Sequence, residues 1–168
     1  QSILITDDAD FADAVELAIS KILETLPRAD MALESWNTNG AVIVVPNLDD
    51  AVDLVDRVAP EHLELAVDDP EGFSDKITNA GAIFLGRYTP EAIGDYVAGT
   101  NHVLPTARSA KFSSGLGVLD FMKRTSTVAC DADSLREIGP AAVKLAVAEG
   151  LGAHARSVAV RLNMPVED

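Results

Sequence analysis

The chain has 168 residues, a length that fits one domain or one domain with a small appendage. Its 13 basic and 27 acidic side chains give a formal net charge of −14, which argues against a nucleic acid partner because phosphates require a basic face. No apolar run approaches the ~18 residues of a membrane span. A single cysteine, Cys130, cannot form an intramolecular disulfide, so we expect a protein of the reducing cytoplasm.

The first half of the chain alternates between strand and helix patterns. Residues 2–6 form a short apolar run typical of a strand, and residues 41–45 (AVIVV) predict a buried strand. Between them lies a helix ended by Pro27, with Asp8 or Asp10 as its N-cap. Its apolar residues recur at spacings of three and four, at Phe11, Val15, Ile19, Ile22 and Leu26. Residues 37–40 (NTNG) have the composition of a turn.

The same alternation continues to about residue 97. Helical patterns cover residues 49–58, 70–78 and 90–97, the last with Pro90 at its first position. Strand patterns cover residues 62–67 and 82–85. Strands that alternate with helices at this spacing predict an α/β fold with a doubly wound, mostly parallel sheet.

The alternation stops at residue 99. Residues 99–130 are rich in Gly, Ser, Thr and basic side chains and show no sustained period, and a long stretch of this kind is usually functional. After it, Ser134 and Glu137 have the spacing of a capping box. Gly139 and Pro140 interrupt the helix that begins there, and helical segments follow at residues 141–149 and 154–162.

We therefore expect two parts. Residues 1–130 would form the α/β domain that includes a long functional arm at residues 99–130. Residues 131–168 would form a small helical appendage.

The chain has three histidines, and each has a carboxylate nearby in sequence. His62 follows Glu61 where a loop enters a predicted strand, so an acid/base pair for proton transfer competes with an ordinary polar surface pair. Asp95 and His102 could address one ligand if Gly99 lets the backbone approach closely.

The third histidine lies near the end of the chain. Glu149 precedes His154 across the glycine pair Gly150 and Gly152. An aspartate and two histidines suit zinc as ligands, although a lone histidine beside a helix is more often packed or solvated.

Four stretches together resemble the C-terminal half of histidinol dehydrogenase. They are APEHLEL (residues 59–65), GDYVAGTNHVLPT (94–106), FSSGLGVLDFMKRTS (112–126) and EGLGAHARSVAVR (149–161). The similarity runs from residue 1 to about residue 163 and makes residues 1–130 resemble the second half of the family's Rossmann-like domain.

This resemblance implies a zinc-dependent enzyme of histidine biosynthesis. The family oxidises L-histidinol to L-histidine in two NAD-linked hydride transfers through an aldehyde. By motif match, Glu61 and His62 are the acid/base pair, and Asp95 and His154 are zinc ligands that also address the substrate. Two further positions contact the substrate by the same match, His102 and Glu149. No NAD-binding residue of this chain is implied.

The resemblance also implies what this chain lacks. The family's other two zinc ligands, a glutamine and a histidine, and its nicotinamide-binding region lie upstream of residue 1. We therefore expect the isolated chain to be inactive, and the alternative is a non-catalytic α/β binding or structural module. In the family the terminal appendage crosses a homodimer, so we expect a homodimer with shared active sites in which His154 faces Asp95 of the other subunit.

Overall fold

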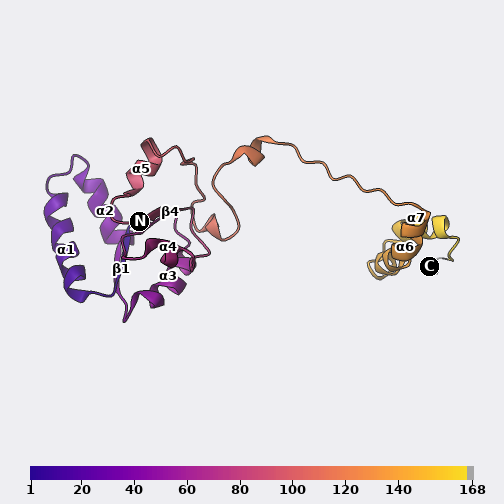
Figure 1. Ribbon diagram of the computed structural model, residues 1–168, viewed down its shortest axis with the longest axis horizontal. Coiled ribbons are helices and arrows are strands. Elements are labelled where there is room, and N and C mark those ends of the chain that lie inside the picture. Colours follow the sequence, from indigo (N-terminus) through magenta and orange to yellow (C-terminus); the bar gives the residue numbers. More distant parts are fainter. Residues whose placement is uncertain (166–168) are drawn as a thin grey trace. The chain divides into compact units, whose positions relative to one another are not determined.

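The computed structural model describes residues 1–165 and divides the chain into two compact units. The first unit spans Gln1–Met122, and the second begins at Lys123. Figure 1 shows the helices and strands of both units and labels most of them.

The strands of the first unit form two separate parallel pairs. The strands β1 (Ile3–Thr6) and β2 (Ala41–Val44) pair with Ile3 opposite Ala41. The strands β3 (His62–Leu65) and β4 (Ala82–Leu85) pair with His62 opposite Ala82. Parallel neighbours joined through helices confirm the predicted α/β class, here with two-stranded sheets.

Five α-helices connect or follow these strands (Figure 1). They are α1 (Ala9–Leu23), α2 (Ala29–Asn39), α3 (Ala51–Val58), α4 (Pro70–Ser74) and α5 (Glu91–Tyr96), with a 3₁₀ turn at Leu48–Asp50 before α3. The buried apolar residues of this unit belong to its helices and strands or directly follow one of them: Ala12, Val45, Ala51, Val55, Ala59, Leu65 and Phe84.

The start of α1 agrees with the sequence, whereas α2 does not. Asp8 caps α1 by accepting a hydrogen bond from the Phe11 backbone N–H at 2.9 Å. The turn predicted at residues 37–40 is wrong, because α2 continues to Asn39 and the Gly40 N–H donates to the Trp36 carbonyl at 2.8 Å. Turn-forming side chains also suit the last turn of a helix, so composition alone could not separate the two.

Three elements near the second strand pair are shorter than the sequence indicates. The strand expected over residues 62–67 ends at Leu65, and the helix expected over 70–78 ends at Ser74. Pro90 is the N-cap of α5 rather than its first helical residue, because its ψ of 152° is extended.

The helix α5 lies on strand β4 through a close contact between a glycine and an aromatic ring. Gly94 and Phe84 are both buried, and a Cβ added at Gly94 would lie 2.5 Å from Cε1 of Phe84. Only a residue without a side chain fits there, so this contact sets how closely the helix approaches the sheet.

The second unit contains a pair of packed helices. The helix α6 (Ala132–Ala148) packs on α7 (Gly152–Ala159), and a 3₁₀ turn (Val160–Leu162) follows. Their small core consists of Val143, Ala155 and Ala159. The predicted helix over residues 154–162 therefore begins two residues earlier and tightens at its end.

Two expectations for α6 are wrong. Asp131, not Ser134, is the N-cap, and its carboxylate accepts a hydrogen bond from the Ser134 backbone N–H at 2.8 Å. The helix also runs through Pro140 without interruption. A proline removes one intrahelical hydrogen bond, and packing of α6 against α7 offsets that loss.

Residues 99–130 contain two 3₁₀ turns, Ser109–Lys111 and Val118–Phe121, and no other helix or strand. Within the described residues, no helix is both long enough and apolar enough to cross a membrane.

We predict that Gly94→Ala destabilises the protein. The added methyl group would overlap the buried Phe84 ring, and overpacking of this kind costs about 1–3 kcal/mol, partly offset by the higher helix propensity of alanine. The free energy of unfolding in urea measures the effect. Gly152→Ala is the matched control, because nothing lies within 4 Å of a Cβ there and no loss of stability is expected. Equal stability of the two variants would contradict this view of the α5 contact.

We also predict that the stability of α6 decreases in acid through Asp131. Hydrogen bonds from the backbone and side chain of Ser134 hold the pKa of the Asp131 carboxyl below its ordinary value of 3.8. A lowered folded-state pKa stabilises the helix above the unfolded-state value, and the benefit is lost as the pH falls through the folded value. Circular dichroism in urea should show the advantage of the wild type over Asp131→Ala shrinking below pH ~4. A difference that does not change with pH would exclude the carboxylate as the cap that matters.

Candidate functional site

The helix α5 presents two carboxylates one turn apart, and each faces a histidine. Glu91 and Asp95 are four residues apart, so they lie on the same side of the helix. Glu91 Oε1 lies 3.6 Å from His62 Nε2, and Asp95 Oδ1 lies 3.7 Å from His102 Nδ1. Two of the predicted site residues, Asp95 and His102, are therefore neighbours, and His62 lies beside the same helix.

The imidazole of His62 is held at the start of β3. A left-handed residue, Ala59 (φ 48°), ends α3, and the chain enters the strand three residues later. The Phe84 ring lies 5.9 Å from the His62 ring, centroid to centroid, at an interplanar angle of 45°. Nε2 of His62 is buried and has no hydrogen-bond partner among the described residues.

Glu61 lies directly beside His62, but its carboxylate makes no contact that assigns a role. Its backbone carbonyl accepts a hydrogen bond from the Ala82 N–H at 2.9 Å, which extends the β3–β4 pairing by one step. The side chain is half-buried, and within residues 1–165 it forms no hydrogen bond or ion pair. Glu61 and His62 are therefore close only because they are consecutive residues, and no contact joins their side chains.

His102 returns to Asp95 after the chain leaves α5. Gly99 has φ +82°, in the left-handed region, and no atom lies within 4 Å of a Cβ built on it. The left-handed backbone of Gly99 suits the turn that follows α5, and the expected close approach of this backbone to a ligand stays a prediction. His102 is 61% exposed and Asp95 34%, so this second pair is open to solvent.

The remaining predicted site residues lie in the second unit. Glu149 is the C-cap of α6, and His154 is in the first turn of α7; both side chains are exposed. Gly150 between them has φ +73° and lets the chain turn from one helix into the next. The two residues thus lie at the end of α6 and at the start of α7, on either side of the turn that joins these helices.

Glu91 was missed by reasoning from sequence. The signal was available, because Glu91 and Asp95 have i, i+4 spacing in the predicted helix, but no motif drew attention to a glutamate after a proline. With His62 and Asp95 it forms a group of three whose donor atoms lie within 4.8 Å of one another, all half-buried. Carboxylate oxygens and imidazole nitrogens are donors that zinc accepts.

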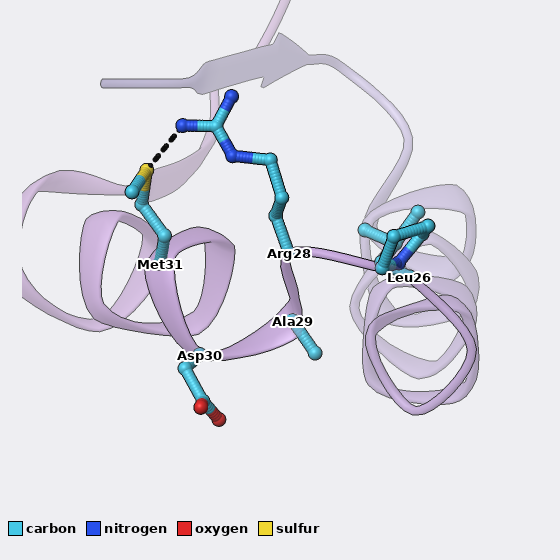
Figure 2. Close-up of a pocket in the computed structure, with 6 residues that line it drawn as sticks. Leu26, Arg28, Ala29, Asp30 and Met31 are labelled. Carbon is cyan, nitrogen blue, oxygen red and sulfur yellow. Dashed lines mark hydrogen bonds between the residues drawn. The ribbon is translucent and has the colours of Figure 1, made fainter.

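A surface hollow at the connection of α1 to α2 offers no comparable chemistry (Figure 2). It is lined by residues 26–31, and Arg28 in it reaches toward the sulfur of Met31 at 2.7 Å. None of the predicted site residues lines this hollow.

Comparison with known proteins identifies the family. The histidinol dehydrogenase profile matches residues 1–162. The chain belongs to the histidinol dehydrogenase family. Curated histidinol dehydrogenases from Rhizobium meliloti (strain 1021) and Rhodospirillum rubrum are each 65% identical to it, over 99% and 97% of this chain. This confirms the resemblance drawn from the motifs.

A solved structure of the same family also resembles this chain. The crystal structure of histidinol dehydrogenase from Elizabethkingia anophelis matches 96% of this chain with a TM-score of 0.77 and 36% sequence identity. The chain spans only about 38% of the length of the curated relatives and 37% of that solved chain.

Proposed function

We propose that this chain is the part of a histidinol dehydrogenase that supplies the proton-transfer groups and two zinc ligands. The observation that carries the proposal is the pair formed by His62 and Glu91, in which a buried imidazole nitrogen faces a carboxylate at 3.6 Å. Family membership supports a role in histidine biosynthesis and an oxidoreductase activity.

The reaction would oxidise L-histidinol to L-histidine. The alcohol would lose a hydride and its hydroxyl proton to give an aldehyde, water would add to the aldehyde, and the hydrate would lose a second hydride and a proton to give the carboxylic acid; two NAD molecules would supply the hydride acceptors. His62 would accept the proton of the hydroxyl as the first hydride leaves, because imidazole exchanges protons near neutral pH. Glu61 would accept a proton from the water that adds to the aldehyde carbon.

The donors of this chain fit zinc in kind. Asp95 offers a carboxylate that is 34% exposed, and His154 offers an exposed imidazole on α7. When bound, zinc would hold the imidazole and amine of the substrate. His102 and Glu149 would contact the substrate beside these ligands.

Two ligands are fewer than the three that a catalytic zinc site usually takes from protein. The isolated chain would therefore bind zinc weakly and would not turn over histidinol. No residue of this chain is assigned to NAD.

We further propose a homodimer with shared active sites. Residues 1–130 would form the Rossmann-like domain and residues 131–168 the dimerisation appendage. Support comes from large apolar side chains of α6, α7 and their connections that are at least 42% exposed: Ile138, Leu145, Val147, Leu151 and Val160. The same proposal places the protein in the cytoplasm, in line with one unpaired cysteine, Cys130, which is exposed.

In the complete enzyme, we predict that His62→Asn lowers kcat by ~10²–10⁴-fold, the usual contribution of a general base. Its zinc content should stay near that of the wild type, because His62 is not assigned to the metal. Stopped-flow hydride transfer and metal analysis measure the two quantities. Asp95→Asn is the control and should lose zinc together with activity. Full turnover by His62→Asn would contradict the proposed role of His62 and favour a non-catalytic module.

Shared active sites predict complementation between two inactive subunits. We expect inactive complete subunits carrying His154→Asn to regain activity when mixed with inactive subunits carrying Asp95→Asn. Each mixed dimer would hold one site with both native ligands, so at most about half of the wild-type activity per mixed dimer returns. Turnover after mixing and mass spectrometry of exchanged subunits measure this. No recovery despite demonstrated exchange would show that each site is built within one chain.

A further inference from the structure

Glu91 faces the one ring nitrogen of His62 that is shut off from solvent. We propose that Glu91 is a positioning residue that holds His62 in the tautomer with its proton on Nε2, and thereby leaves Nδ1 as the proton acceptor. The inference rests on the proposed function, because it concerns the residue assigned there as the base.

The geometry favours this tautomer. His62 Nε2 is buried without a hydrogen-bond partner among the described residues, and Glu91 Oε1 is 3.6 Å away. An ionised carboxylate only accepts hydrogen bonds, so a lone pair on Nε2 would face it unfavourably, whereas an N–H would be attracted. The distance is longer than a hydrogen bond, as catalytic contacts often are before substrate binds.

The other groups given near His62 are one acidic side chain and one uncharged ring. From α5, Asp95 is the other acidic neighbour, with a donor atom within 4.8 Å of the ligand atoms of His62 and Glu91. From β4, the neighbour is the uncharged ring of Phe84. No basic side chain of the described residues forms an ion pair with Glu91 that would draw its carboxylate from the imidazole.

Glu91 is also well anchored. Its backbone N–H donates to Glu64 Oε1 at 2.6 Å, which ties the first residue of α5 to strand β3. The helix is fixed again by the Gly94–Phe84 contact. Since Glu64 and His62 belong to the same strand, one strand holds both the imidazole and the helix end that carries its partner.

Tautomer selection matters because a neutral imidazole carries its proton on either nitrogen. A base whose proton sits on the nitrogen that faces the substrate cannot accept another there. Loss of Glu91 should therefore lower kcat with little change in KM. Outer partners of functional histidines typically contribute ~10–100-fold to activity, and we expect a loss in that range.

The direct test is ¹⁵N NMR of histidine-labelled chain at pH ~9, where imidazoles are neutral. The chain has three histidines, so His62 is assigned by the signal missing in His62→Asn. We expect one protonated nitrogen, Nε2, in the wild type and in Glu91→Gln, whose amide oxygen still accepts. Glu91→Ala should give a mixture of tautomers. Glu71→Ala is the matched control, because Glu71 is an exposed glutamate in the first turn of α4 and should change nothing.

The variant Glu91→Asp provides a second test in case Glu91→Ala does not fold. It keeps the negative charge at the helix start but withdraws the oxygens by one methylene, so it should give the mixture that Glu91→Ala gives. If Glu91→Ala does not fold, loss of the single tautomer in Glu91→Asp but not in Glu91→Gln supports the inference, and equal behaviour of the two overturns it.

Kinetic measurements on the complete enzyme provide the second test. Glu91→Ala should lower kcat by ~10–100-fold with KM within about twofold, and Glu91→Gln should keep most of the activity. An unchanged tautomer in Glu91→Ala overturns the inference whatever the activity. Full turnover by His62→Asn would instead defeat the proposed function, since the NMR result needs no turnover.

Discussion

The arrangement of the site depends on the contact between Gly94 and Phe84. Because the helix has no side chain at this point, α5 lies directly on the aromatic ring that also borders His62. The carboxylates at Glu91 and Asp95 then point to two different histidines at nearly equal distances. The site's electrostatics thus follow from one steric condition, namely how closely a helix can approach a strand.

The fold class was predictable because the spacing of apolar residues along the chain shows which faces of helices and strands are buried. Apolar runs marked three strands and alternation marked β3, and the two candidate caps Asp8 and Asp10 marked the start of α1, since a capping carboxylate acts within three residues. The helix α2 was not predictable from the composition of residues 37–40, where the same side chains suit a turn or a helix end. Pro140 misled for a related reason, because tertiary packing on α7 outweighs a missing hydrogen bond.

The candidate site was predictable only where residues are close in sequence. Glu61 and His62 are adjacent, and Asp95 and His102 are joined by one short loop, so motifs found them. Glu91 approaches His62 across 29 positions of sequence, through the meeting of α5 with β3, and no local pattern encodes that distance. Glu149 and His154 belong to the second unit, and a single sequence does not specify how the two units assemble.

Glu91 and Asp95 have i, i+4 spacing on one helix, so the positions of the two carboxylates beside their histidines depend on each other. Each residue of an α-helix turns the chain by about 100°, so one residue inserted or deleted between Glu91 and Asp95 would turn the two carboxylates to different sides of α5. A substitution at Glu91 or Asp95 alters one pair, whereas a change of length inside the helix separates the two pairs. The spacing of the two carboxylates along α5 is therefore a constraint separate from the identity of either side chain.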